Sequence, residues 1–380
     1  MPEPIISQKR SSRFHFGFQE AGLVAVIFVL GLLLTIFGGS VSVPVVQTNA
    51  AGDPERVFVI NANGEREPKM EERNKFFNAQ TLSQLAKDTS FIAVMAVGAT
   101  VVIISGGIDL SVGAIYALAS VLGALALQHF GPEGVKSNVS AFASIPIGIL
   151  CCAGAGALCG LLNGAMIVAL RVHPFIITLG TMTIFRGIAF VKTNGQSVGG
   201  FPPAFRDLIR YEAGPRLSVV PLVVMLIVTV LGWIFLSRLA AGRRVYAIGG
   251  NELASRYSGI RVERVKLGVF ILSGLTAGIA ALLSIGYYGA ATSGDGRGYE
   301  LNVIAAAVVG GASLSGGRGT ALGACLGALV IQMITSGIVI LGIDQNYGDI
   351  IIGAMVIIAV VLDQFNNWLG KRRLAARATV

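Results

Sequence analysis

Long apolar stretches separated by short polar ones run along most of the chain. A helix needs about 20 mostly apolar residues to cross a bilayer, and shorter helices are allowed inside a bundle. By this criterion the pattern predicts about ten membrane-spanning segments, and hence an all-α polytopic membrane helix bundle. The segments 174–191 and 300–313 are the candidates for tilted, broken or re-entrant helices. The predicted segments are 22–43, 89–105, 110–130, 144–170, 174–191, 218–238, 267–290, 300–313, 319–341 and 347–365.

The polar stretches divide the chain into a membrane domain and its flanks. The membrane domain takes 22–365, with an N-terminal tail over 1–21 and a basic tail over 366–380. Two loops are long, and we expect 44–88 on the external side of the membrane and 239–266 in the cytoplasm. An even number of spans places both termini on the same side of the membrane.

The distribution of charge indicates on which side of the membrane the two termini lie. The chain is 54% hydrophobic and only 13% charged, with 50 glycines, a composition typical of packed membrane helices. With both termini cytoplasmic, 16 of the 29 Lys and Arg fall inside, 12 fall outside in longer loops, and Arg186 stays within a span. Short cytoplasmic loops carry such an excess in membrane proteins. The net charge of +9 is therefore a topology signal. It does not indicate nucleic acid, which would require basic residues interleaved with aromatics on an exposed domain.

The external stretch 44–88 has two parts. Asn61 to Gly64 and the mixed charges after them predict a turn-rich loop, and Thr81 to Ala86 predict a short helix leading into the second span. A solvated connector and a docking surface for an external partner are both compatible with this pattern.

The internal stretch 239–266 predicts a short, stiff helix. Gly249 and Gly250 favour a turn, Asn251 is an N-cap candidate, and Glu252–Tyr257 form a helix that Gly259 ends. One interpretation is a basic loop held to anionic lipid. The other is a lever on which a second protein acts.

Residues 106–113, GGIDLSVG, place an acid between two apolar stretches. An ionised carboxylate at membrane depth is unfavourable by about 3 kcal/mol even on lenient scales, so Asp109 needs a structural or functional reason. Glycines on both sides suit a backbone that breaks and restarts as a helix. We expect Asp109 to cap the third span, a role compatible with shaping a gate. Direct binding of a solute or ion is the third alternative.

A second segment repeats part of this pattern. Residues 310–317, GGASLSGG, agree with 106–113 at five of eight positions, offset by 204. Broken helices in two halves of a membrane protein are a pointer to a transport path. Matches among Gly, Ala and Leu arise easily in this composition, which limits the weight of the repeat.

A few other polar residues lie near the predicted spans. Arg186 either snorkels to the external interface or, as the less favoured alternative, pairs with an acid. Phe175, Thr178 and Thr183 are candidates for lining a path, although threonines in membrane helices more often bond their own backbone or a neighbouring helix. Asp295, Arg297 and Glu300 form a polar external turn that is either solvated or in contact with a partner.

Four segments together resemble the permease subunits of the ribose/xylose/galactose class of bacterial ABC sugar importers. The segment GGIDLSVGA at 106–114 is the most specific, and the four cover the chain from about 90 to 365 in the family's order. The 44–88 insertion is less typical of that family. The other three segments are HPFIITLGTMTIFRG at 173–187, GRRVYAIGGNELASRYSGIRVERVK at 242–266 and NVIAAAVVGGASLSGGRGT at 302–320.

The resemblance implies a subunit of the bacterial inner membrane that forms the path for a monosaccharide or similar small polyol. Its implied partners are a cytoplasmic ABC ATPase, a periplasmic sugar-binding protein, a second permease copy as homodimer or heterodimer, and the lipid bilayer. Which sugar is carried stays open. The predicted break, its partial repeat and the path-lining candidates named above lead us to expect the path or gate at Gly106, Gly107, Asp109, Leu110, Ser111, Phe175, Thr178, Gly310, Gly311 and Ser313. The residues implied for coupling to the ATPase are Arg243, Asn251, Glu252, Ala254, Ser255, Tyr257, Ser258, Gly259 and Ile260.

We expect no enzymatic, cofactor or metal site in the chain. The phosphate-loop pattern G-x-x-x-x-G-K-S/T does not occur in the sequence, so ATP and Mg²⁺ are expected on the partner ATPase. The three histidines and the external carboxylates form no catalytic pattern. The alternative function is an ion-coupled secondary transporter of a small polar solute. It would need several paired intramembrane charges, and only Asp109 and Arg186 are candidates.

Overall fold

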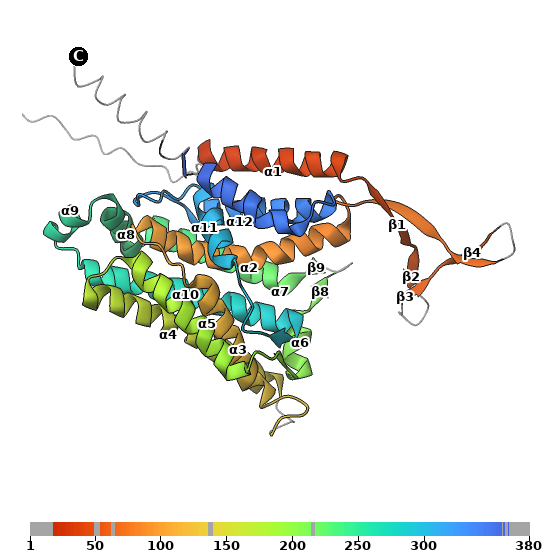
Figure 1. The fold of residues 1–380 in the computed structure, drawn as a ribbon, viewed down its shortest axis with the longest axis horizontal. Coiled ribbons are helices and arrows are strands. Elements are labelled where there is room, and N and C mark those ends of the chain that lie inside the picture. The colour runs from red at the N-terminus through yellow and green to blue at the C-terminus, as the bar shows by residue number, and fades with distance from the viewer. Residues whose placement is uncertain are drawn as a thin grey trace, which may run out of the picture.

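Seven helices of the described chain are long and apolar enough to cross a membrane, and three shorter apolar helices join them. The structure, a computed structural model, describes residues 18–48, 54–61, 65–135, 140–213 and 217–358, together with 360, 361 and 364. The predicted all-α membrane bundle is confirmed (Figure 1). The seven long helices are α1 (Phe18–Phe37), α2 (Ala79–Ile104), α4 (Ala141–Leu170), α5 (Pro174–Thr193), α7 (Val219–Arg238), α10 (Val262–Tyr288) and α12 (Ala321–Ile340). The three shorter ones are α3 (Val112–Gln128), α11 (Tyr299–Val309) and the stretch Gln345–Ile358, which begins with the 3-10 helix η1 (Gln345–Tyr347).

Helix α2 is the centre of the bundle. It packs against α10, α12, α7 and α11, and 94% of its most apolar stretch is buried. The corresponding buried shares are 17% for α7 and 11% for α1. In water such apolar exposed faces would be strongly unfavourable, whereas a bilayer solvates them. The outer helices therefore face lipid, and α2 faces protein.

Helices α4 and α10 make the most extensive helix–helix contact, and they cross at glycines. A Cβ atom at Gly156 would overlap the carbonyl oxygen of Gly274, and one at Gly274 would overlap that of Gly156. Small residues let membrane helices approach closely enough for backbone contact. The high glycine content is thus used in packing.

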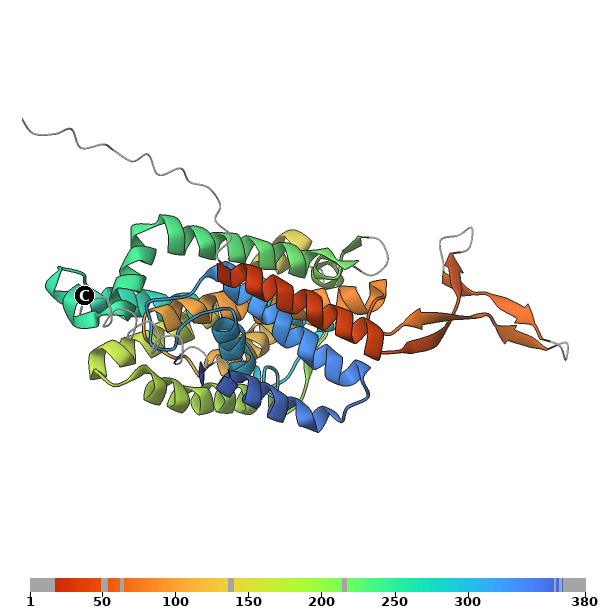
Figure 2. The same cartoon turned by 90° about the horizontal axis from the view of Figure 1, so that it is seen from above.

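The predicted turn-rich loop after the first span is wrong for its mixed-charge part, which forms strands, whereas residues 62–64 of the predicted turn lie outside the described residues. Helix α1 ends at Phe37, and the chain then forms a β-ribbon that projects from one end of the bundle (Figures 1 and 2). β-branched residues such as Val41 and Val43 favour extended backbone, which explains part of the difference. The antiparallel pairs are β1 (Ser40–Pro44) with β6 (Met70–Asn74), β2 (Val46–Thr48) with β3 (Pro54–Arg56), and β4 (Phe58–Ile60) with β5 (Arg66–Pro68).

The predicted short helix at 81–86 and the span at 89–105 are one continuous helix, α2. Asn78 caps its N-terminus, because the side-chain oxygen of Asn78 accepts a hydrogen bond from the N–H of Thr81 at 2.8 Å. The helix continues through the charged residues Lys87 and Asp88, because these two side chains have partners within the protein.

Short elements connect the helices. The predicted turn at Gly249 and Gly250 is wrong, because both residues end a helix, α8. These elements are α6 (Pro203–Ile209), α8 (Ala240–Gly250), α9 (Glu252–Tyr257), the pair β7 (Val198–Gly199) with β10 (Ala290–Ala291), and the pair β8 (Glu212–Ala213) with β9 (Leu217–Ser218).

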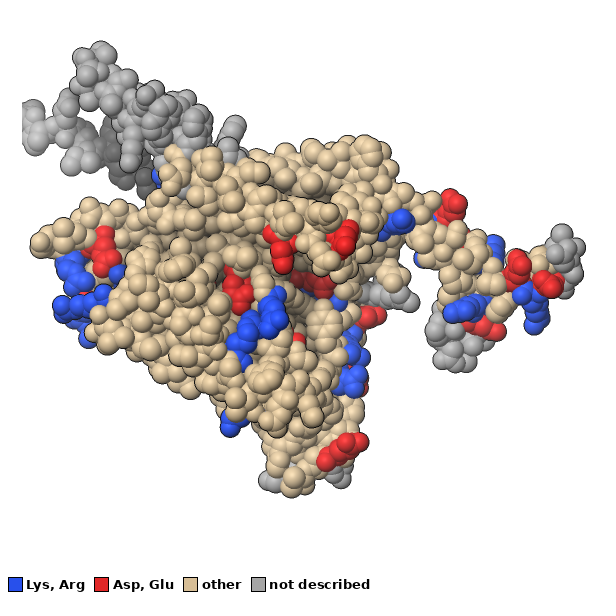
Figure 3. All heavy atoms as spheres, in the orientation of Figure 1, with Lys and Arg blue, Asp and Glu red and all other residues tan. Residues whose placement is uncertain are grey.

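The two ends of the bundle differ in charge. Helices α8 and α9 lie at the end opposite the β-ribbon, and α1 runs from their side toward the ribbon (Figure 2). Lys and Arg gather around the α8–α9 end, whereas the ribbon carries both signs (Figure 3). This distribution agrees with a cytoplasmic position for α8 and α9.

Candidate functional site

The helix breaks at the GGIDLSVG segment, as the sequence predicts. Helix α2 ends at Ile104, and α3 begins at Val112. Gly106 has a positive φ of 83°, which an L side chain rarely adopts. We call residues 105–111 the first break.

Asp109 is the centre of a buried hydrogen-bond network at the first break. Its side chain is 2% exposed. One carboxylate oxygen, Oδ1, accepts from the N–H of Ser111 at 3.0 Å and from its hydroxyl at 2.6 Å. The other, Oδ2, accepts from the hydroxyl of Ser273 on α10 at 2.8 Å. Asn163 on α4 donates to the Ser111 hydroxyl at 2.7 Å. The carboxylate therefore ties the start of α3 to α4 and α10.

The predicted capping role of Asp109 takes a modified form. Ser111 occupies the N-cap position of α3 and makes no side-chain cap hydrogen bond. Asp109 lies two residues earlier and accepts from the backbone of Ser111, outside the first helical turn. The bond still satisfies a buried donor at the start of the helix.

Thr178 on α5 holds the backbone of the first break from another side. Its hydroxyl accepts from the N–H of Leu110 at 3.2 Å and lies 3.3 Å from the carbonyl oxygen of Ile108. Thr178 is fully buried, whereas Phe175, one turn earlier on α5, has an exposed side chain. Thr183 donates to the carbonyl oxygen of Gly180 on its own helix. Of these three α5 residues, Thr178 is thus the one that hydrogen-bonds to the first break.

Residues 310–320, between α11 and α12, form the second break. Thr320 caps α12, because its hydroxyl accepts from the N–H of Gly323 at 2.9 Å. A Cβ atom at Gly310 would overlap the carbonyl oxygen of Gly323, so the start of the break packs directly on α12. The predicted path residues Gly310, Gly311 and Ser313 all lie in this segment.

The two breaks and α8 meet through backbone atoms. The N–H of Gly317 donates to the carbonyl oxygen of Ile104, the last residue of α2, at 2.8 Å. A Cβ atom at Gly249 would overlap that same carbonyl oxygen and lie 2.5 Å from the nitrogen of Gly317. A Cβ atom at Gly316 would lie 3.2 Å from the Cα of Gly106. We call this contact of Ile104, Gly249 and Gly317 the glycine junction.

Tyr246 adds a side-chain bond to the glycine junction. Its hydroxyl donates to the carbonyl oxygen of Gly319 in the second break at 2.6 Å. Burial raises the pKa of Tyr246 above its ordinary value, so the phenol stays protonated and able to donate. Tyr246 is one of the residues that sequence reasoning missed, since a tyrosine in a basic loop gives no distinguishing signal.

The predicted helix at Glu252–Tyr257 is present as α9. The side chain of Asn251 accepts from the N–H of Ala254 at 2.9 Å, and Gly259 has a φ of 80°. Past its end, the N–H of Ile260 bonds the carbonyl oxygen of Ser255 at 3.1 Å. The glycine and this bond end the helix as predicted.

Two large side chains of α9 are exposed to solvent. Leu253 is 61% exposed and Tyr257 is 83% exposed. Ser255 faces inward and is buried, while Glu252 bonds Lys266 of α10 at 2.8 Å. The helix is thus fixed to the bundle on one side and presents an apolar surface on the other. Among the other residues predicted for coupling, Ser258 donates to the carbonyl oxygen of Ala254, and Arg243 donates to that of Arg238.

Comparisons with known proteins identify the family. Residues 81–360 match the family described as the permease component of branched-chain amino acid transport systems. The chain belongs to this permease family. Together with the apolar helices, membership makes it a multi-pass protein of the inner membrane. The permease match starts inside α2, so α1 and the β-ribbon lie outside it.

Several curated permeases are similar to the chain. The ribose import permease of Escherichia coli K12 is 38% identical over 290 residues, which are 76% of this chain and 87% of that protein. The D-allose transport system permease of the same organism is 37% identical over 290 residues, 76% of this chain and 85% of that protein. The fructose import permease of Rhizobium meliloti is 32% identical over 304 residues, 78% and 80% of the two chains. No solved structure matches the chain.

The permease also contains an ion pair between α5 and α11. Pairing of Arg186 with an acid was the less favoured of the two alternatives that the sequence offered. Arg186 does not snorkel: its guanidinium lies 2.9 Å from the carboxylate of Glu300. It also donates to the carbonyl oxygens of Ser293 and Asp295, at 3.3 and 3.2 Å. The turn around Asp295 is therefore bonded to α5, and Glu300 is buried rather than solvated.

A second set of charges lies where α2 meets the end of α10. Lys87 is 2% exposed, although the sequence pattern assigned it to an external loop. Its ammonium lies 3.1 Å from the carboxylate of Asp88 and 4.0 Å from the centre of the Tyr287 ring. Carboxylate and aromatic ring together offset the loss of hydration. Because Tyr287 lies 200 positions away from Lys87 in the sequence, no local pattern could have indicated the aromatic part of this site.

Proposed function

We propose that the chain is the membrane-spanning permease subunit of an ATP-driven importer and forms the path for a monosaccharide or similar small polyol. The observation that carries the substrate class is the 38% identity to a ribose import permease over 87% of that protein. The allose and fructose permeases among the relatives support the same class. The family description names branched-chain amino acids, but the similar permeases quoted above are named for sugars.

Helix α9 supports coupling to a separate ATPase. It is short, capped at both ends, bare at Leu253 and Tyr257, and joined to the bundle by the Glu252–Lys266 pair. Such a helix suits insertion of its apolar face into a groove of a cytoplasmic partner, which carries the ATP and Mg²⁺. The glycine junction would then transmit displacement of α8 and α9 to both breaks. A periplasmic sugar-binding protein on the ribbon side and a second permease copy complete the proposed assembly.

The proposal is tested by sugar uptake in cells lacking this chain. Radiolabelled ribose, allose and fructose are supplied in turn, and we expect deletion to abolish uptake of one small sugar or polyol. That uptake should survive an ionophore that dissipates ion gradients while ATP is maintained, and it should fail on ATP depletion. The opposite pattern would favour the ion-coupled alternative and contradict the proposal.

A further inference from the structure

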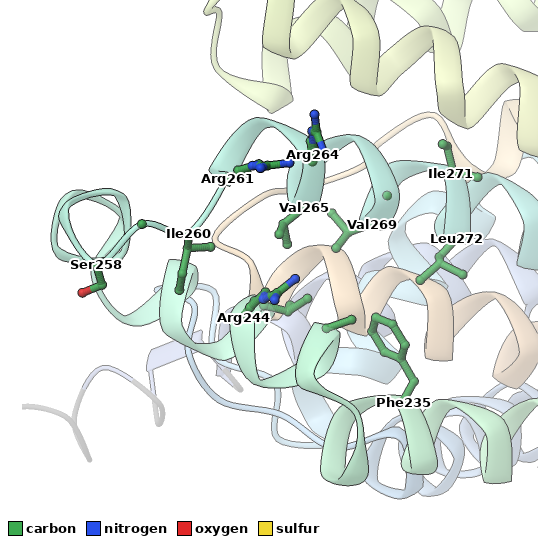
Figure 4. Close-up of a pocket in the computed structure, with 14 residues that line it drawn as sticks. Phe235, Arg244, Ser258, Ile260, Arg261, Arg264, Val265, Val269, Ile271 and Leu272 are labelled. Atoms are coloured by element: carbon green, nitrogen blue, oxygen red, sulfur yellow. The ribbon is translucent and has the colours of Figure 1, made fainter.

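A cavity of about 860 Å³ opens beside α9. Its walls come from the end of α7, the start of α8, residues 258–261 and the first three turns of α10. In Figure 4, Phe235 enters from α7, and Arg244 extends from α8 toward Val265 and Val269. The cavity is therefore a recess between two apolar helices at the charged end of the bundle.

Three arginines line the opening of this cavity. They are Arg244, Arg261 and Arg264, and all three are exposed. Within the described chain none of them forms a salt bridge or a side-chain hydrogen bond with an acid, whereas neighbouring basic residues do. Arg256 pairs with Glu263 at 2.6 Å, and Lys266 pairs with Glu252 at 2.8 Å. The nearby acids are thus already engaged, and the opening keeps an uncompensated positive charge.

The deeper part of the cavity is apolar. Val265, Val269 and Leu272 follow one another on a single face of α10, and Phe235 lies opposite on α7. From Arg261 to Leu272 a helix rises by about 16 Å. Both α7 and α10 are apolar enough to cross a membrane, so this floor descends from the water interface toward the hydrocarbon.

We infer that the cavity binds an anionic phospholipid, with the headgroup phosphate on the three arginines and an acyl chain along the apolar floor. Guanidinium groups match phosphate oxygens in charge and geometry. Basic pockets between membrane helices on the cytoplasmic side suit anionic headgroups. A free phosphate or an acidic protein segment would use the arginines but leave the floor unfilled. The inference rests on the cytoplasmic position of α8 and α9, and it does not depend on which sugar is carried.

The bound lipid would touch the segment that ends α9. Ser258, Gly259 and Ile260 are part of the cavity wall. A lipid seated there fills the space behind the base of α9 and restricts its movement relative to α10. We therefore expect the lipid to affect how firmly α9 is held as well as the stability of the chain.

The test measures retention of phosphatidylglycerol by the full-length protein in detergent, using native mass spectrometry and thermal unfolding. The test variant is Arg244→Gln with Arg264→Gln. The matched control is Arg171→Gln with Arg238→Gln, which removes the same charge at the same end but outside the cavity lining. We expect affinity for phosphatidylglycerol to fall about tenfold or more in the test variant and by less than about twofold in the control. A third variant, Arg244→Lys with Arg264→Lys, keeps the charge and should retain most of the binding if the protein is folded.

Two further ligands distinguish the sources of the phosphate. Phosphatidylcholine and inorganic phosphate should each stabilise the protein far less than phosphatidylglycerol does. Equal loss in test and control variants would overturn the inference, because the effect would then be general charge. Stabilisation by inorganic phosphate equal to that by phosphatidylglycerol would also overturn it. So would unchanged lipid retention in the test variant, even if binding of a partner protein were lost.

Discussion

The two breaks of the bundle look alike in sequence but are held in different ways. The first break is bonded by side chains from three other helices: Asn163 on α4, Thr178 on α5 and Ser273 on α10. The second is in close backbone contact at Gly317 and at Gly310, and it also accepts a hydrogen bond from the side chain of Tyr246. Side-chain networks around a buried carboxylate are specific and rigid, whereas packing between glycines depends on the close approach of two backbones. The first break is thus built as a fixed point.

Their neighbours differ as well. The second break touches α8 at Gly249 and at Tyr246, and α8 leads directly into α9. On the side of the first break, α8 approaches Ile104, the last residue of α2, at Gly249. We therefore expect a displacement of α9 to move the second break first.

The most damaging change should be Gly249→Val in the glycine junction. Its side chain would overlap the carbonyl oxygen of Ile104, and backbone on both sides leaves no room to adjust. We expect a loss of roughly 3 kcal/mol or more in unfolding free energy, or failure to assemble. Thermal unfolding of the purified protein measures this effect.

The adjacent glycine supplies the control. A Cβ atom at Gly250 meets no atom within 4 Å, so Gly250→Ala should change the unfolding free energy by at most about 1 kcal/mol, in the stabilising direction. Equal damage from both substitutions would mean that the close contact at Gly249 is not the cause.

The second largest effect should come from Asp109→Ala in the first break. It leaves the Ser111 and Ser273 donors unsatisfied in a buried site, and should lower the unfolding free energy by about 3 kcal/mol. Asp109→Asn keeps an acceptor and the shape, so it should lose only about 1 kcal/mol. Thermal unfolding separates the two. If the alanine variant were as stable as the asparagine variant, Asp109 would not be the fixed point of the first break.

The smallest effect on stability should be that of Tyr246→Phe, which removes one hydrogen bond to the second break. We expect a loss of about 1 kcal/mol in unfolding free energy. Sugar uptake should fall even though the protein stays folded, because this bond joins α8 to the second break. Uptake equal to that of the wild type would remove Tyr246 from the proposed transmission.

Local sequence signals predicted much of this molecule. The length of the apolar stretches predicted the membrane helices, because a helix must be long and apolar to cross a bilayer. Asn251 and Gly259 predicted the two ends of α9, because capping is a local interaction. The break at 106–113 followed from an acid and glycines between apolar stretches. Membership of the permease family agrees with the resemblance carried by these same segments.

The contacts between distant segments could not be predicted in the same way. The Arg186–Glu300 pair joins residues 114 positions apart, and Asp109 and Ser273 are 164 apart. For a single serine, asparagine or tyrosine in an apolar helix, the local sequence does not indicate which distant residue it will bond. The β-ribbon was missed because most of its strands are only three residues long, too short for an alternating pattern to show. Sidedness, the partners and the roles assigned to the path and coupling residues stay predictions.

The central claim, that α9 couples ATP hydrolysis to sugar movement, is tested most directly by measuring ATP hydrolysed per sugar transported. The permease is reconstituted with its ATPase and binding protein, as wild type, Glu252→Ala, Gly259→Val and the control Gly250→Ala. Gly259 has a positive φ that valine does not tolerate, and Glu252 anchors α9 to Lys266. We predict that in the first two variants uptake falls about tenfold or more while hydrolysis continues, and that the control keeps the wild-type ratio. Unchanged uptake per ATP in both α9 variants would contradict the account.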